Sequence, residues 1–277
     1  MYRLGYTETT LLFYFYLDHI LNVTIEERIN SKHDLINWLY STSGFYDKKM
    51  KGEYFNFDAE KCSQSVVYNT YMNTILRKIK KYDNETILCF HNLPNTLLPY
   101  KEQFLQYINY KPNKKYVHKH VVFDFINSKN VLIVHNLSEL FKNQYESGNL
   151  KLIYPDLPDI KKISTYLPGY TFCNNGPDNS ILDTATNHCI KIGEIIDNNE
   201  IDCVIISCGA YSVLLADYVH FKKGKEVIVS GGELPNYFGV ITKRSPAPSN
   251  ETKHLWIHVP KNLRPPNYEK IENGTYW

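Results

Sequence analysis

Residues 202–244 constrain the fold most, because their pattern predicts a strand, a glycine turn, a helix, a second strand and a second glycine turn. The apolar run at residues 203–206 is rich in β-branched side chains, which is typical of a buried strand, and it leads into Gly209. Helix-spaced apolar residues follow, and a second apolar run at residues 227–229 leads into a pair of glycines at residues 231–232. This order predicts a βαβ unit, in which ligands bind where the parallel strands end.

Strands and helices alternate along the carboxyl-terminal part of the chain. We predict a strand at residues 130–134 and a helix from Ser138, whose hydroxyl we expect to cap that helix. A loop-rich stretch after Pro155 leads to a helix through residues 190–196 and then to the βαβ unit. With 277 residues, of which 43% are hydrophobic, the chain can bury a sizeable core. We therefore predict an α/β protein with a Rossmann-like layered fold and a mainly parallel sheet.

The amino-terminal part combines helical patterns with a long polar loop. Residues 11–17 are apolar and aromatic, but they are too few to span a membrane and lack a signal-peptide cleavage site. We predict that they form a buried helix or strand. Helical spacing of apolar residues recurs at residues 35–40 and 66–79, and the pattern at residues 86–90 indicates a strand. The polar, aromatic loop at residues 41–65 is long enough to be functional.

Charge and cysteine content argue against some classes of function. The formal net charge is only +2 and the lysines are scattered, so nothing favours nucleic-acid binding. A short basic run contains His118 and His120, which we expect on one side of a strand, at a solvated edge or an acceptor-binding surface. The six cysteines form no CxxC pair, which predicts reduced thiols in a cytoplasmic protein. No strand is followed by GxGxxG, which argues against a Rossmann oxidoreductase or methyltransferase.

Three segments near the carboxyl terminus carry a more specific signal. They are GGELPNYFGVITKR at residues 231–244, LWIHVP at residues 255–260 and IENGTYW at residues 271–277. Together with the CGAY turn at residues 208–211, they resemble the carboxyl-terminal half of proteins with a GT-D-type glycosyltransferase fold. That family shows a GG-x-L-Q-x-x-FGI-x-GKRW stretch after a GAYG turn, then a WI-x-P segment and a closing EGG-x-YW. The resemblance extends over residues 130–277.

The resemblance implies both an organisation and an activity. It implies a single GT-D-like domain over residues 1–277, with an acidic-loop half for the acceptor at residues 1–120. Residues 121–277 would form the nucleotide-binding half and end in a strap over the body. The implied reaction moves a sugar from a nucleotide-sugar donor to a glycan or glycoprotein acceptor, usually with a divalent metal such as Mn or Mg.

The amino-terminal motif of that family is altered in this chain. Its RYGDGE-like sequence corresponds to residues 48–56, where Gly52 and Glu53 match, but Lys51 replaces the first carboxylate of the Asp-x-Glu pair. Two such carboxylates hold a cation against the donor diphosphate. Glu53 is therefore the candidate catalytic residue. Lys51 either stabilises the leaving phosphate itself or marks a site that has lost its activity.

A second Asp-x-Glu pair follows in the same loop. Asp58 and Glu60 would restore a metal site if the loop folds back, although acidic pairs in loops commonly face water.

On the donor side, the resemblance and the glycine turns select residues that follow the two strands. A glycine lets the backbone approach a ligand closely, and an arginine fork matches diphosphate oxygens. An amide after Leu234 would have to replace the glutamine of the family. The resulting candidates are Gly209, Tyr211, Gly231, Gly232, Asn236 and Arg244.

Two functions stay open at this stage. The leading hypothesis is a glycosyltransferase that uses a nucleotide-sugar donor. The competing hypothesis is a GT-D-like fold retained as a binding or structural module without catalysis, because Lys51, Pro235 and Ser245 all depart from the family pattern. Arg244 also has a simpler interpretation, as a salt bridge that holds the carboxyl-terminal tail.

Overall fold

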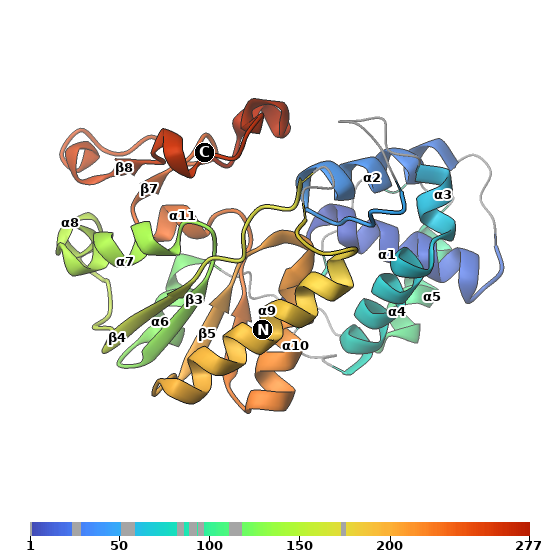
Figure 1. Ribbon diagram of the computed structural model, residues 1–277, viewed down its shortest axis with the longest axis horizontal. Coiled ribbons are helices and arrows are strands. Elements are labelled where there is room, and N and C mark those ends of the chain that lie inside the picture. Colours follow the sequence, from blue (N-terminus) through green and yellow to red (C-terminus); the bar gives the residue numbers. More distant parts are fainter. Residues whose placement is uncertain are drawn as a thin grey trace. The chain divides into compact units, whose positions relative to one another are not determined.

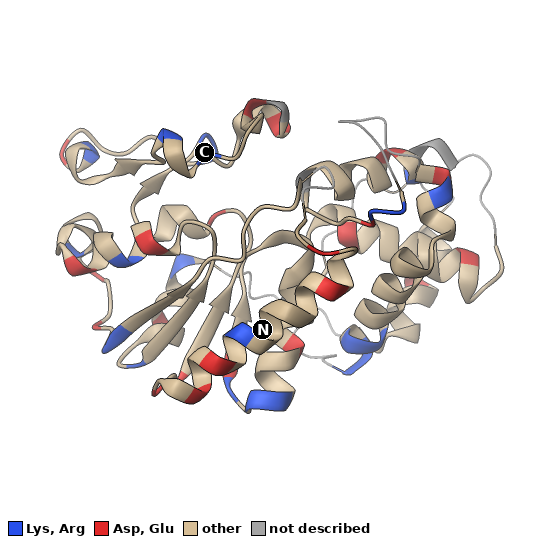
Figure 2. Ribbon diagram, in the orientation of Figure 1, with Lys and Arg blue, Asp and Glu red and all other residues tan. Residues whose placement is uncertain are grey.

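The computed structural model describes residues 2–23, 29–50, 59–81, 86–88, 93, 97–110, 118–172 and 176–277 (Figure 1). The chain divides into two compact units. Unit 1 comprises Met1–Tyr116, Thr171–Asn187 and Gly209–Asp217, and unit 2 comprises Val117–Tyr170, His188–Cys208 and Tyr218–Trp277. Helices α9 (Ile181–Asn198) and α10 (Ser212–Lys223) each contribute residues to both units. Lys and Arg are interspersed with Asp and Glu on the helices (Figure 2).

Unit 2 is built around a four-stranded parallel sheet, which confirms the predicted α/β class (Figure 1). Its strands are β3 (Asn130–Val134), β4 (Lys162–Tyr166), β5 (Cys203–Ile206) and β6 (Glu226–Val229). The strand order is β4-β3-β5-β6. In the register, Leu132 pairs with Ser164 of β4 and with Val204 of β5. Every residue of β5 is buried, as expected for a central strand covered on both faces.

The strand order places a topological switch point between β3 and β5. From β3 the chain first crosses to β4 on one side, and it later returns to β5 on the other side. Crossovers that leave in opposite directions separate the loops that follow the two strands, and open α/β sheets bind ligands at this position. The predicted βαβ unit is confirmed as β5, α10 and β6, in which the two strands are parallel neighbours.

The remaining elements of unit 2 extend the sheet's core. They are α6 (Lys119–Ile126), α7 (Ser138–Glu146), α8 (Asn149–Ile153), α11 (Leu234–Tyr237) and the short parallel pair β7 (Val240–Ile241) and β8 (Ile257–His258). The rings of Phe141 and Phe238 stack at 5.0 Å and join α7 to the segment after α11. The tail contains four 3₁₀ turns: Lys253–Leu255, Lys261–Leu263, Tyr268–Lys270 and Glu272–Gly274. The chain ends on Trp277, which is buried and donates a hydrogen bond to Tyr170 at 3.0 Å.

Unit 1 is mainly helical. It contains α1 (Tyr6–His19), α2 (Ile29–Thr42), α3 (Ala59–Gln64), α4 (Val66–Lys81), α5 (Leu98–Tyr107) and the two-residue parallel strands β1 (Tyr2–Arg3) and β2 (Thr86–Ile87). Residues 11–17, predicted as a buried helix or strand, lie in α1 and are all buried. A helix that is apolar on all sides needs cover on all sides. No helix in the described ranges has the length and apolar character needed to cross a membrane.

Three local predictions in unit 2 were wrong. Ser138 does not cap α7, because it is the first residue of the helix and Leu137 occupies the capping position. The segment with His118 and His120 is not a strand: α6 begins at Lys119, because the apolar residues that follow it have helical spacing. The stretch after Pro155 also contains the edge strand β4. The sequence analysis missed it because only one of its five residues is buried, so it lacks an apolar run.

Candidate functional site

The candidate site is the carboxyl edge of the sheet in unit 2, where the loops are tied together in pairs. Asn136, after β3, exchanges two hydrogen bonds with Gly169, after β4: its amide nitrogen donates at 3.0 Å and its amide oxygen accepts at 2.7 Å. On the other side of the switch point, the Ser207 hydroxyl donates to the Gly231 carbonyl at 3.1 Å. These bonds fix the loops that flank the switch point.

Two of the candidate residues for binding the nucleotide-sugar donor, Gly232 and Arg244, meet at the turn after β6. A Cβ atom placed on Gly232 would lie 3.0 Å from Arg244 Nη1 and 3.4 Å from the Tyr276 ring, so a side chain here would press against the guanidinium. Arg244 Nη2 forms an ion pair with Glu272 at 2.5 Å and donates to the Tyr276 hydroxyl at 3.1 Å. Its guanidinium also lies 4.3 Å from the centre of the Tyr276 ring. Arg244 therefore holds the tail beside the glycine turn.

The guanidinium of Arg244 retains hydrogen-bonding capacity. Its bonds to Glu272 and Tyr276 both use Nη2, and 39% of the side chain is exposed. An arginine has five N–H donors in a fixed fork. Within the described ranges, Nε and Nη1 have no protein acceptor, and Nη1 is the atom that faces Gly232. One edge of the fork thus remains available to an anionic ligand.

Asn236 is engaged by the protein. It is buried in α11, its side-chain oxygen accepts a hydrogen bond from Ser245, and its backbone carbonyl accepts one from Tyr154 at 2.7 Å. Ser245 occupies the position where the resembling family has tryptophan. The Ser245 hydroxyl therefore anchors the amide that was expected to reach the sugar.

Gly209 and Tyr211 belong to unit 1, and the backbone approach at Gly209 is to protein. Gly209 has a φ of +63°, and a Cβ atom there would lie 2.3 Å from the Ser43 carbonyl oxygen. Ala210 donates its N–H to the same carbonyl at 2.8 Å, and its own carbonyl accepts from the Tyr71 hydroxyl at 3.0 Å. Tyr211 is 2% exposed. A contact inside unit 1 thus accounts for the glycine.

The candidate residues of the amino-terminal loop are mostly outside the described residues. Lys51, Glu53 and Asp58 lie there, whereas Glu60 is exposed in the first turn of α3. Among the residues that the structure describes, no group of three or more His, Cys, Asp or Glu side chains is placed to hold a metal ion.

His135 is a site residue that the sequence analysis missed. It directly follows β3, and its backbone N–H donates to the Tyr166 carbonyl at 3.1 Å. Its Nδ1 accepts the N–H of Leu137 at 2.9 Å, and its ring lies 5.0 Å from that of Phe141. Burial lowers the pKa of His135 to about 3. Its position directly after a buried strand was the only signal in the sequence.

A second missed group lies at the end of β4. The Tyr166 hydroxyl is 2.7 Å from Nδ1 of His188, which is buried in α9. Burial, with smaller contributions from Cys208 and Cys189, raises the pKa of Tyr166 to about 12. The phenol therefore stays protonated at neutral pH.

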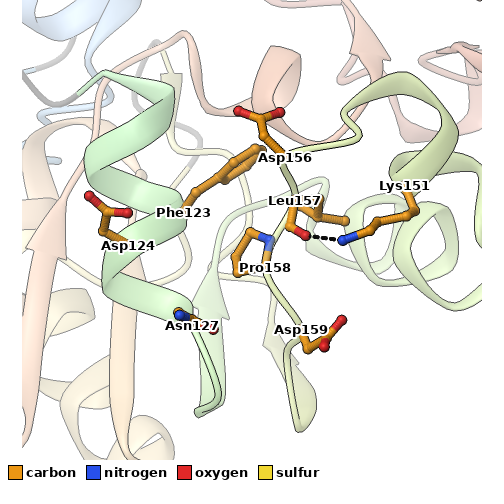
Figure 3. Close-up of a pocket in the computed structure, with 8 residues that line it drawn as sticks. All are labelled: Phe123, Asp124, Asn127, Lys151, Asp156, Leu157, Pro158 and Asp159. Carbon is orange, nitrogen blue, oxygen red and sulfur yellow. Dashed lines mark hydrogen bonds between the residues drawn. The ribbon is translucent and has the colours of Figure 1, made fainter.

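A pocket of about 340 Å³ lies at the opposite edge of the sheet (Figure 3). Its lining residues precede β3 and β4 in the chain, and three of them are aspartates. They are Phe123, Asp124, Asn127, Lys151, Asp156, Leu157, Pro158 and Asp159. Partial burial opposes ionisation of Asp156, but the Lys119 ammonium, bonded at 3.2 Å, holds its pKa below the ordinary value. Lys151 donates to the Leu157 carbonyl. The pocket lies away from the switch point.

We expect His135 to make stability depend on pH. Its pKa in the folded protein, about 3, lies below the ordinary value of 6.5, so the unfolded chain binds the proton first as the pH falls. Stability is therefore lost below pH 6.5. From pH 7 to pH 5 this group should cost about 1–2 kcal/mol. Urea unfolding of wild type and His135→Asn at both pH values measures it, since the variant lacks the titrating group. A difference between the two proteins that does not change with pH would contradict the assignment.

Comparisons with models of known protein families, with curated protein sequences and with solved structures gave no match. The sequence motifs and the geometry of the carboxyl edge are therefore what supports a function.

Proposed function

We propose that the protein is a glycosyltransferase that uses a nucleotide-sugar donor, and that the turn after β6 binds the donor diphosphate. The observation that carries the proposal is the available edge of the Arg244 guanidinium, which faces Gly232 at the carboxyl end of a parallel strand. A bidentate arginine contact suits two diphosphate oxygens. Because Gly231 and Gly232 have no side chains, the phosphates can approach the backbone of this turn.

In the proposed reaction, a hydroxyl of a glycan or glycoprotein acceptor attacks the anomeric carbon of the donor sugar. The new carbon–oxygen bond forms as the bond to the diphosphate breaks, and the electron pair of that bond leaves with the diphosphate. Arg244 stabilises the resulting negative charge. Glu53 takes the proton of the hydroxyl as general base, in keeping with the family resemblance. A divalent metal would neutralise further charge, and its proposed ligands are Asp58 and Glu60.

A thermal-shift screen of the full chain tests the donor site. The ligands are nucleoside diphosphates and nucleotide sugars, each with and without manganese. Because a ligand that binds only the folded state stabilises it by about 2.7 kcal/mol at 100 times its Kd, one donor should raise the Tm by several degrees. A shift that needs manganese supports a metal site, and a shift without manganese supports Lys51 as the counter-charge of the phosphate. If no nucleotide sugar changes the Tm, the proposal fails.

Replacing Arg244 should weaken donor binding. Because hydrogen bonds to charged groups contribute about 1.5–3 kcal/mol, Arg244→Gln should raise the Kd for the nucleoside diphosphate about tenfold to a hundredfold. Isothermal titration calorimetry measures this change. Lys261→Gln, at an exposed lysine of the same tail, is the matched control and should leave the Kd unchanged.

A further variant separates binding from tail anchoring. Glu272→Gln removes the ion-pair partner of Arg244 and leaves the guanidinium in place. We expect this variant to keep its affinity for the diphosphate. An equal loss of affinity in Arg244→Gln and Glu272→Gln would show that Arg244 acts only by holding the tail.

The alternative is a binding or structural module without catalysis. It is favoured by the hydrogen bond from Ser245 to Asn236, which engages the amide expected to contact the sugar. Assays of donor hydrolysis and sugar transfer distinguish the two functions. Donor binding with neither activity, across the panel of donors, would favour the module.

A further inference from the structure

We propose that His135 is a ligand-binding residue at the switch point, where its Nε2–H donates a hydrogen bond to an uncharged oxygen of the nucleotide sugar. The acceptor is a carbonyl of the base or a hydroxyl of a sugar. The inference rests on the proposed function, but it concerns a residue that neither the glycine turns nor the family resemblance selects.

The position of His135 follows from the ladder of the sheet. Its backbone N–H bonds to Tyr166 of β4 at 3.1 Å, while the residue before it, Val134, accepts from Ser207 at 3.0 Å. The chain therefore turns away from the sheet at His135, between the ends of β4 and β5. This is where the crossovers diverge and where α/β sheets hold their ligands.

Local contacts fix which ring nitrogen carries the proton. The N–H of Leu137 donates to Nδ1, so Nδ1 has no hydrogen and Nε2 has one. The contact with Phe141 limits rotation of the ring. Within the part of the chain that the structure describes, no residue accepts a hydrogen bond from Nε2, although the side chain is partly exposed. An oriented N–H donor is left for a ligand.

The surroundings favour an uncharged acceptor. With a pKa of about 3, the imidazole is neutral at physiological pH and offers no charge to a phosphate. Among the described residues, the ring receives a hydrogen bond from a backbone N–H and lies beside an aromatic ring. The carboxylate of Glu139, in the first turn of α7, already offsets the partial positive charge of that helix end. The cationic fork of Arg244 lies instead beside the turn after β6. The N–H groups of His135 and Arg244 therefore suit different parts of one ligand.

Two substitutions separate the two ring nitrogens. The side-chain oxygen of His135→Asn can replace Nδ1 as the acceptor for Leu137, but this variant has no donor at the position of Nε2. His135→Gln keeps a donor near the position of Nε2 and loses the acceptor. We expect the Asn variant to weaken binding of the nucleotide sugar about tenfold and the Gln variant to recover most of it. We expect the Gln variant to have the lower Tm.

Calorimetric titrations of wild type and both variants test this inference. The titrants are the nucleotide sugar that stabilises wild type and the matching nucleoside diphosphate. If His135→Asn loses affinity for both titrants, the oxygen that accepts the hydrogen bond belongs to the nucleoside. If it loses affinity for the nucleotide sugar alone, that oxygen belongs to the transferred sugar. If wild type binds and His135→Asn binds equally well, this inference is overturned and the proposed function stands. If wild type binds neither titrant, both are overturned.

Discussion

Gly209→Ala should lower the free energy of unfolding by about 2–5 kcal/mol. The backbone at this residue has a φ of +63°, which costs an alanine about 1–2 kcal/mol. The new methyl group would also lie 2.3 Å from the Ser43 carbonyl oxygen, which the N–H of Ala210 holds in place. Overpacking against a fixed backbone adds about 1–3 kcal/mol. Urea denaturation of the variant and wild type measures the loss.

Gly224→Ala is the matched control, because Gly224 also has a φ of +63° but a methyl group added there would meet no atom within 4 Å. It ends α10 by donating its N–H to the His220 carbonyl, as a glycine typically does after a helix. Its replacement should cost only about 1–2 kcal/mol. Equal losses at Gly209 and Gly224 would show that conformation alone, and not contact with Ser43, requires the first glycine.

Glu53→Gln should reduce sugar transfer at least about a hundredfold with little effect on stability. A general base contributes about 10²–10⁴ to a rate, and glutamine keeps the size of glutamate while it loses the ability to accept the proton. The measurement is kcat for transfer and for donor hydrolysis, together with the Tm and the Kd of the donor. A loss confined to kcat identifies a group that acts in the chemical step.

Glu102→Gln provides the control for that experiment, since Glu102 is an exposed carboxylate in α5 with no proposed role. Its activity should equal that of wild type. If Glu53→Gln also retains full activity, Glu53 has no part in the chemistry, and the module without catalysis becomes the better explanation. A raised requirement for manganese in Glu53→Gln, with kcat restored at high metal concentration, would instead identify Glu53 as a metal ligand.

The parts of the fold that depend on local pattern could be predicted from the sequence. The unit of β5, α10 and β6 was predicted because two apolar runs flank a helical period and each ends at a glycine. Helix α4 was predicted because its apolar residues recur at helical spacing. For residues 11–17 the sequence left helix and strand open, because a segment buried on all sides has no periodicity.

The parts that depend on distant partners could not be predicted. Gly209 suggested a close approach, but its partner Ser43 is far away in the chain and no local pattern names it. His135 is a lone histidine whose character depends on the Leu137 N–H and on burial at the end of β3. Ser138 failed as a cap by a single position, which lies within the ordinary uncertainty of a helix boundary.

The composition of unit 1 from three separate segments has a consequence for synthesis on the ribosome. Residues near 45 form three of their hydrogen bonds with residues made much later: Gly44 accepts from Thr171, the Tyr46 hydroxyl bonds to Thr184, and Ser43 accepts from Ala210. The nascent chain must therefore carry this segment without these three partners until more than a hundred further residues have been translated. Contacts of such long range slow folding and leave apolar surface exposed to aggregation. Slower translation before Thr171 would prolong this exposure, whereas a chaperone that binds the nascent chain would shield it.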